Sequence, residues 1–401
     1  MFRFGKIANT IFVCLGILFI PFPFHLFPFQ EKITVFIFRN LLELIHNLLF
    51  GDNQYKEISS DSTYLYTLVV ILILFSILIS LLILLKKVPK KIELKFYEFS
   101  HILISYYLSL QLLKYGFEKI IRSQFYIPEP NTLYTPLGFL DKDILFWSTI
   151  GSSHSYAVFL GIAQIIPAVL LLFYRTRFVG LLISIIVFSN IVAINFSFDI
   201  SVKIYTFFLL ILSIIGFSKY FSIIYTIATK KIVNLNLKRK SNFNLNPFVY
   251  TFSKSLVVLL LFFEVLYPAI QANNFNNDTS ERPFLHGAYK VVEMLENGVT
   301  VTDNKLKRVF IHKMDYFIFQ YQNDTMQDYK LELNQIKNQF VLTNYNLKQT
   351  TIDYKYSSKD SLLTLKYKMD DTTYQIKTKQ LNWKALPLLQ HNFHWTIEGI
   401  E

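Results

Sequence analysis

Basic clusters recur between the long apolar runs of this chain, and their spacing is the feature that most restricts its fold. Apolar stretches dominate the sequence as far as Ile270, and basic residues gather after every second one, at positions 86–91, 175–177 and 230–240. Basic loops stay on the cytoplasmic side of a membrane because translocating them is costly. The alternation therefore predicts a polytopic membrane protein whose soluble C-terminal part lies on the far side.

Composition agrees with a membrane protein. Hydrophobic residues make up 52% of the chain and its mean hydropathy is +0.35, although the last third is polar. The net charge of +12 sits in short loops and in a tail of mixed sign, where it suits anionic lipid headgroups better than nucleic acid. The one cysteine, Cys14, lies in the first apolar run, so no intrachain disulfide forms and burial alone must stabilise the tail.

Seven apolar runs have the length of a membrane-spanning helix, about 20 residues. They cover residues 7–27, 64–85, 97–121, 155–174, 178–196, 202–227 and 250–270. The basic clusters place the N-terminus in the cytoplasm and the C-terminus outside, which requires an odd number of spans such as these seven. We therefore expect a multi-pass protein of the inner (plasma) membrane, in contact with the lipid bilayer, whose C-terminal domain is periplasmic or otherwise extracytoplasmic.

The first of these runs has a rival interpretation as a secretory signal peptide, because it follows Arg3 and Lys6. No small-residue cleavage site comes after it, and Pro21, Pro23 and Pro28 stand among bulky phenylalanines. These features favour a retained anchor.

Residues 33–50 show a different pattern, in which polar and apolar side chains occupy opposite faces of a helix. The polar face carries Arg39, Asn40, Glu43, His46 and Asn47, and the apolar face carries Phe36, Ile37, Leu41, Leu44 and Leu48. This pattern favours an external helix in the membrane interface over a crossing helix. An eighth span would also place the N-terminal basic residues outside or invert the later clusters.

After residue 272 the hydropathy changes from continuous to alternating. Residues 273–282 form a polar linker, and residues 288–293 lead into Asn297-Gly298, a strong hairpin-turn signal. Alternating segments follow at 316–321, 328–333, 339–343, 351–356, 361–367, 373–378 and 394–397. About eight short strands without helical periodicity predict a small, closed antiparallel β-barrel-like domain.

The predicted fold class is therefore a membrane helical bundle followed by a β domain, in four parts. Residues 1–62 hold the first anchor and the interfacial helix, residues 63–272 the rest of the bundle, residues 273–282 the linker, and residues 283–401 the β domain.

Several strings of the helical part resemble one known family. They are Tyr115-Gly116-Phe117-Glu118-Lys119, Gln124-Phe125, FWSTIGSS at 146–153, LLLFYRTR at 170–177 and NIVAINFSFDISVK at 190–203. In this order they resemble the four-helix core of DoxX-family membrane proteins, here about residues 97–227. The strings at 59–64 and 287–298 resemble a bacterial subgroup of that family with a C-terminal β domain.

The resemblance implies a helical bundle and leaves its activity open. Some DoxX relatives are linked to thiosulfate oxidation with quinone as acceptor, or to redox homeostasis, so quinone is the cofactor that the resemblance implies. Such proteins often carry an acidic residue in the helix after a glycine. Here Gln164 follows Gly161 instead, which argues against a proton relay of the family type.

Polar side chains inside the apolar runs are the candidate ligand-binding residues, because such groups are costly in a membrane. They are Glu264, Asn190, Asn195, Gln164, Gln111, Lys114, Asp199 and Lys203. In one interpretation they line a polar cavity for quinone or another polar ligand. In the other, the amides bond neighbouring helices and Asp199 pairs with Lys203 one turn later. We expect Glu264 to face the bundle and to meet Gln111, Lys114, Asn190 or Asn195.

No catalytic or metal-binding motif is recognisable in the sequence. His391 and His394 lie three apart, but no cysteine or carboxylate cluster completes a metal site. The chain also lacks a glycine-rich phosphate loop, a nucleophile elbow and a haem-attachment motif.

Two classes of function therefore compete. The residues favour a non-catalytic membrane anchor whose external β domain binds a protein or an envelope component. The family resemblance favours a membrane redox accessory subunit that binds quinone or a small oxidisable substrate. Neither class involves nucleic acid.

Overall fold

A computed structural model describes residues 2–22, 24–51, 57–221, 229, 246–301, 305–369, 371–390 and 395–396. The chain forms two compact units. The helical unit comprises residues 1–124 and 155–275, and the barrel unit comprises residues 125–154 and 276–401. Each unit has a hydrophobic core of its own. The basic cluster at 230–240, His391 and His394 lie outside the described residues.

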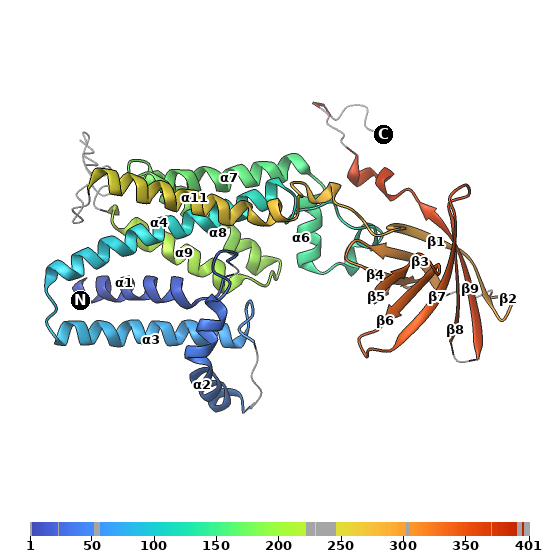
Figure 1. Cartoon of the computed structure of the whole chain (residues 1–401), viewed down its shortest axis with the longest axis horizontal. Coiled ribbons are helices and arrows are strands. Elements are labelled where there is room, and N and C mark those ends of the chain that lie inside the picture. Colours follow the sequence, from blue (N-terminus) through green and yellow to red (C-terminus); the bar gives the residue numbers. More distant parts are fainter. Residues whose placement is uncertain are drawn as a thin grey trace. The chain divides into compact units, whose positions relative to one another are not determined.

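The helical unit contains a helix in each of the seven apolar runs predicted from the sequence. Its described long helices are α1 (Phe2–Phe19), α2 (Gln30–Phe50), α3 (Thr63–Leu85), α4 (Lys90–Ile120), α7 (His154–Leu172), α8 (Arg177–Ser197), α9 (Lys203–Ser218) and α11 (Pro247–Gln271) (Figure 1). Helix α1 packs against α3 and α4, and α8 packs against α9. Among the described residues, four helices (α3, α7, α8 and α11) are long and apolar enough to cross a membrane.

Helix α1 is shorter than the run predicted to hold the first span. It ends at Phe19, and the described residues from 20 to 29 are not helical. Pro21 accounts for the end, because a proline disfavours helical geometry in the residue before it. We call residues 20–29 the connector. The predicted span of 7–27 was therefore wrong at its C-terminal end.

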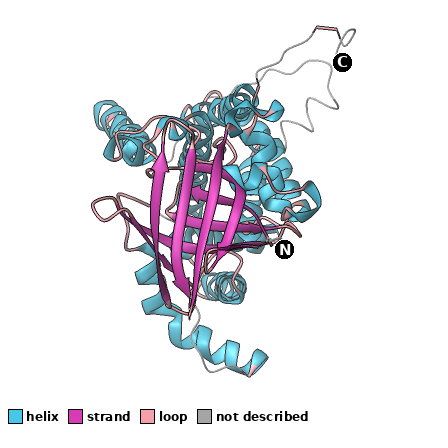
Figure 2. Cartoon of the chain, turned by 90° about the vertical axis from the view of Figure 1, so that its right-hand side faces the viewer, coloured by secondary structure: helices cyan, strands magenta, loops and turns pink. Residues whose placement is uncertain are grey.

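The described residues of the barrel unit form nine antiparallel strands. They are β1 (Gly287–Glu296), β2 (Val299–Thr300), β3 (Leu306–His312), β4 (Tyr316–Tyr321), β5 (Met326–Asn334), β6 (Gln339–Thr343), β7 (Gln349–Ser357), β8 (Leu362–Met369) and β9 (Thr372–Leu381). Strands β3 to β9 pair in order, and β1 pairs with both β3 and β9, so eight strands close into the predicted barrel (Figure 2). Strand β2 pairs with β1 through the predicted turn, where Asn297 and Gly298 have φ of 48° and 84°.

Strand β3 was not predicted from the sequence because its polar and apolar residues do not alternate. Val309 and Ile311 belong to the barrel core, whereas Phe310 between them belongs to a separate outer cluster. The ring of Phe310 stacks on Tyr134, with ring centroids 6.2 Å apart. A strand covered on both faces has a continuous apolar run instead of an alternating pattern.

Residues 125–154, which the sequence pattern placed in the helical bundle, belong to the barrel unit. Their elements are α5 (Pro130–Leu133), η1 (Leu137–Phe139) and α6 (Lys142–Gly151), and the later short helices of this unit are η2 (Asn277–Thr279), η3 (Trp383–Ala385) and η4 (Pro387–Leu389). Helix α5 contacts β1 and β3. The backbone N–H of Ile127 also donates a hydrogen bond to Asp278, 2.8 Å away.

Candidate functional site

Glu264, near the C-terminal end of α11, holds the connector. Its side chain is only 3% exposed. One carboxylate oxygen accepts a hydrogen bond from the backbone N–H of His25 at 2.6 Å, and the other accepts from Leu26 at 2.7 Å. The His25 ring nitrogen Nδ1 lies 3.1 Å from the first oxygen. Glu264 is buried, as expected, and its hydrogen bonds go to the connector; of the partners predicted for it, Lys114 is close enough to interact with its charge.

The reason for this pairing is the break after α1. Backbone N–H groups outside a helix lack the acceptors that a continuing helix would give them. The connector's backbone can reach the end of α11, and the Glu264 carboxylate supplies two acceptors there. No periodic pattern in the sequence marks such a contact.

Gln30 holds the connector from its other side. This residue was not among the candidates predicted from the sequence. Its side-chain oxygen accepts from the backbone N–H of Phe22 at 2.9 Å. Its side-chain nitrogen lies 3.1 Å from the carbonyl oxygens of Ile17 and Leu18, in the last turn of α1, and of Ile20 directly after it. These carbonyls lack partners within the helix. The available signal in the sequence was the position of this glutamine directly after a proline-rich break, where its side-chain amide can pair with free backbone groups.

One stripe of α4 faces the connector and α9. The Tyr107 hydroxyl bonds the Tyr205 hydroxyl at 2.9 Å. The Lys114 ammonium lies 4.5 Å from the ring centroid of Phe22. Gln111 shares the stripe by helical spacing and is fully buried, and within the described part of the chain no hydrogen-bond partner is found for its amide atoms.

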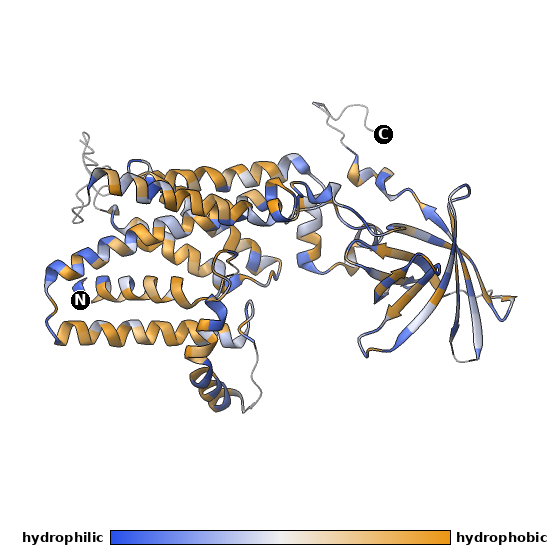
Figure 3. Ribbon diagram, in the orientation of Figure 1, coloured by the Kyte–Doolittle hydropathy of each residue, from blue (hydrophilic) through white to orange (hydrophobic). Residues whose placement is uncertain are grey.

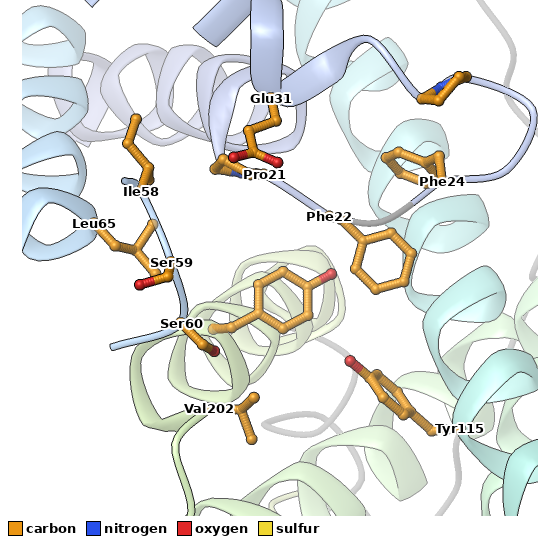
Figure 4. Close-up of a pocket in the computed structure, with 12 residues that line it drawn as sticks. Pro21, Phe22, Phe24, Glu31, Ile58, Ser59, Ser60, Leu65, Tyr115 and Val202 are labelled. Atoms are coloured by element: carbon orange, nitrogen blue, oxygen red, sulfur yellow. The ribbon is translucent and has the colours of Figure 1, made fainter. Parts of the chain in front are cut away.

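A cavity of about 540 Å³ lies beside the connector (Figure 4). It is lined by Pro21, Phe22, Phe24, Pro28, Glu31, Ile58, Ser59, Ser60, Leu65, Tyr115, Val202 and Tyr205. The Phe22 ring stacks on Tyr205 with centroids 5.6 Å apart and planes 16° apart. Aromatic faces, tyrosine hydroxyls and serine hydroxyls together suit a ring-bearing ligand with oxygen acceptors.

Asp199 and Lys203 form the predicted pair at the start of α9, with Nζ and the carboxylate 2.7 Å apart. Sequence analysis missed the third member, Asp61. Its two carboxylate oxygens accept from the backbone N–H groups of Lys203 at 2.9 Å and Ile204 at 3.0 Å. Asp61 therefore caps α9 from 142 residues away along the chain.

The remaining predicted residues are dispersed over the helical unit. Asn195 is buried and donates to the Thr206 hydroxyl at 3.0 Å, which links α8 to α9. Asn190 is exposed. Gln164 is buried beside a close approach of α4 and α7, where a Cβ on Gly116 would lie 3.4 Å from its own Cβ.

Glycines permit that approach. A Cβ on Gly161 would lie 2.7 Å from the carbonyl oxygen of Gly116, and a Cβ on Gly116 would lie 3.0 Å from that of Gly161. The structure therefore does not gather the eight predicted residues into one site. Of these eight, Gln111 and Lys114 lie on the stripe of α4 that faces the connector, and Glu264 bonds the connector itself.

A second buried polar cluster lies in the barrel unit. Nε2 of His286 is 2.7 Å from the Glu129 carboxylate, and the backbone N–H of Lys313 donates to the same oxygen at 3.3 Å. The Lys313 ammonium stands over the ring of Tyr126, 2.8 Å from its centroid. No group of three or more histidine, cysteine or acidic side chains that could hold a metal is found among the described residues.

Opposing effects set the pKa values in this cluster. Burial raises the pKa of Glu129, but the hydrogen bond from His286 and the charges of His286, His312 and Lys313 outweigh it, so the pKa lies below its usual value. Burial lowers the pKa of Lys313 to about 8, although the charge of Glu129 acts the other way. The cluster is a hydrogen-bonded and charged contact that ties residues 126–129 to the barrel.

Comparison with known proteins yields one short similarity. No family model and no solved structure matches the chain. Over 98 residues it is 36% identical to the uncharacterised protein YwoB of Bacillus subtilis (strain 168), a stretch that is 24% of this chain and 61% of YwoB. The chain thus covers less than two thirds of that relative's length, and the name of the relative states no activity.

Proposed function

We propose that this chain is a polytopic, DoxX-like membrane protein that anchors an extracytoplasmic β-barrel binding unit and has no catalytic activity of its own. The distribution of exposed apolar side chains carries the proposal. In the helical unit, large apolar side chains remain exposed along several helices, for example Leu85 at 77%, Leu259 at 66% and Ile186 at 63%. Figure 3 shows these helices as predominantly hydrophobic ribbons. Helices that are apolar on all sides and long enough are typical of membrane-spanning segments.

Helix α2 supports an interfacial position of its own. Its buried face packs on the helical unit through Thr34, Phe38 and Leu42. A second stripe with helical spacing is apolar and exposed, and it consists of Ile33, Ile37, Leu44 and Leu48. Lys32 and Arg39 are exposed beside it. A helix with such a stripe and flanking cations lies well in the headgroup region.

A topology reporter tests the proposal. Green fluorescent protein that folds only in the cytoplasm, fused after Glu401, should remain dark, and alkaline phosphatase at the same place should be active. The same pair inserted after Val88, in the basic loop between α3 and α4, should give the opposite result. Fluorescence from the Glu401 fusion would overturn the proposed orientation.

Quinone binding in the helical unit is a second proposal, and the cavity beside the connector supports it. Tyr205 and Phe22 offer a stacked aromatic wall there, with Ser59 and Ser60 on other parts of the lining. Quinone should then co-purify with the wild-type chain and be lost in Tyr205→Ala. Tyr66→Ala, at a tyrosine exposed on α3, is the control. Solvent extracts of wild type without quinone would dismiss this alternative.

A further inference from the structure

The interior of the barrel is packed at one end and hollow at the other. At the end where β1 begins, core side chains including Tyr289, Phe317, Phe340 and Leu363 are fully buried. Phe340 stacks on Tyr354 there, with ring centroids 4.4 Å apart. At the opposite end, where β1 ends and β9 begins, a cavity of about 600 Å³ remains. We call it the barrel hollow.

Aromatic rings form the wall of the barrel hollow. Five of its lining residues are Phe319, Tyr321, Tyr329, Tyr367 and Tyr374. Tyr367 and Tyr374 are opposite each other on β8 and β9 and stack with ring centroids 5.1 Å apart and planes 20° apart. Phe319 meets Tyr329 edge to face at 5.8 Å. Packed rings of this kind offer fixed flat faces to a ligand.

A β-bulge in β1 aims two more side chains into the barrel hollow. The pairing with β9 shifts between Val291 and Glu293, so the extra residue, Val292, points outward and is exposed. Val291 and Met294 both pack on the barrel core although they are three apart. Without the shift, strict alternation would turn Met294 and Glu296 outward. Both line the barrel hollow instead.

The polar groups of the barrel hollow are nearly all uncharged. Its charged lining residues, Glu296 and Lys305, have opposite signs. The Tyr321 hydroxyl donates to the side-chain oxygen of Gln327 at 2.9 Å. Burial, helped by the neighbouring Tyr374, raises the pKa of Tyr367 to about 12. This hydroxyl therefore stays a neutral hydrogen-bond donor at physiological pH.

We propose that the barrel hollow binds a small, uncharged molecule that has a flat ring system and one or two oxygen acceptors. Its rings would stack on Tyr367, Tyr374 or Phe319, and its oxygens would accept from tyrosine hydroxyls. The absence of net charge in the lining disfavours anions and cations, and the rings favour a flat partner over a flexible chain. Eight-stranded barrels have room for one such ligand, and barrel mouths are common ligand sites.

This inference rests on the proposed function only in taking the barrel as the binding unit, and it does not depend on the topology. If the reporter at Glu401 showed the opposite orientation, the proposed ligand site in the barrel would be unaffected. An empty barrel hollow would in turn leave the orientation of the anchor unaffected.

Photolabelling of the full chain in nanodiscs tests it, with 7-azido-4-methylcoumarin as a flat, uncharged probe. Light converts its azide into a nitrene that inserts into neighbouring bonds, and peptide mass spectrometry locates the adducts. We expect adducts on the peptides that carry Phe319 to Tyr329 and Tyr367 to Tyr374, suppressed by excess 4-methylcoumarin. Adducts confined to the helical unit, or unaffected by the competitor, would overturn the proposal.

Variants sharpen the test. Thr350→Trp should fill the barrel hollow and abolish specific labelling, and Tyr367→Leu should weaken competitor binding roughly two- to tenfold through the lost stacking. Tyr345→Leu, at an exposed tyrosine outside the barrel hollow, should label like wild type. Circular dichroism shows which variants fold. If Tyr367→Leu does not, Tyr367→Phe replaces it and should keep most of the binding. Undiminished labelling of a folded Thr350→Trp variant would refute the assignment.

Discussion

In the helical unit, buried and half-buried acidic side chains bind backbone that is distant in sequence. Glu264 accepts from residues of the connector, and Asp61 accepts from the first turn of α9. In the barrel unit, neighbouring strands satisfy each other's backbone around a closed sheet, and polar side chains collect in the Glu129 cluster and in the barrel hollow. The contrast has a physical origin. A helix that breaks leaves N–H and C=O groups to be paired by side chains, whereas a closed barrel leaves its inward side chains available to shape a cavity.

Loss of the outer aromatic contact of the barrel unit should have the largest effect. Phe310 is fully buried between β3 and Tyr134, so Phe310→Ala should lower the free energy of unfolding of this unit by about 3–5 kcal/mol. The three tryptophans of the chain, Trp147, Trp383 and Trp395, all belong to the barrel unit. Denaturant unfolding followed by tryptophan fluorescence therefore reports on it selectively.

Two further variants serve as controls for the effect of Phe310→Ala. Ile336→Ala, at a side chain that is 96% exposed, should change stability by less than about 0.5 kcal/mol. Tyr134→Ala should destabilise the same transition. If it leaves that transition unchanged, residues 125–154 do not stabilise the barrel and the division into two units is wrong.

Loss of the Glu264 carboxylate, which we call the clamp on the connector, should have the second-largest effect on stability. Glu264→Ala leaves the N–H groups of His25 and Leu26 without their acceptor, which should cost about 3 kcal/mol. Glu264→Gln keeps one acceptor oxygen and should cost roughly half as much. Unfolding in mixed micelles, followed by circular dichroism, measures both. The control is Glu43→Ala, which removes an i,i+4 pair with Arg39 at 2.8 Å and should cost about 0.3–0.5 kcal/mol. Equal effects of Glu264→Ala and Glu43→Ala would refute the clamp.

The distant cap of α9 should contribute less. Asp61→Ala should destabilise the start of this helix by about 1 kcal/mol, the usual value of an N-terminal cap. Hydrogen exchange at the amides of Lys203 and Ile204, which donate to Asp61, measures the effect locally. Asp199→Ala should leave both exchange rates nearly unchanged, because its side chain is 83% exposed and exposed ion pairs contribute little. If these amides exchange faster in Asp199→Ala than in Asp61→Ala, Asp199 and not Asp61 is the residue that caps α9.

The smallest expected effect is a pH dependence of the barrel unit. The pKa of Lys313 is lowered from 10.5 to about 8 by burial, so the folded state binds fewer protons than the unfolded state between these values. Stability should therefore rise with pH across that window. The rise is small because Lys313 as a whole is only half-buried, so nearby solvent screens its charge.

Lys313→Met isolates this contribution from that of other groups. Tryptophan-monitored unfolding at several pH values between 8 and 10.5 should give a smaller increase in stability for the variant than for wild type. A variant whose stability rises as steeply as that of wild type would show that Lys313 is not the group responsible.

Much of the fold was predictable because its signals are local. Strands β4 and β6 have the predicted bounds, 316–321 and 339–343, because alternation over a few residues reflects one wet and one dry face. The Asn297-Gly298 turn was predictable because its positive φ values select these residues. Strand β3 was not, because the cover on its outer face comes from Tyr134, far away in the chain.

Local patterns in the chain are enough to predict the order of helices and strands, the apolar surface of the helical unit and the closure of the barrel from repeated hairpins. These follow from hydrophobic periodicity and turn chemistry, which act over a few neighbouring residues. Four features became visible in the folded chain alone: residues 125–154 join the barrel, Glu264 binds the connector, Asp61 caps α9, and a bulge turns Met294 and Glu296 inward. Each of these depends on which unpaired polar group or uncovered ring comes within contact distance after folding, and no local pattern in the chain encodes that distance.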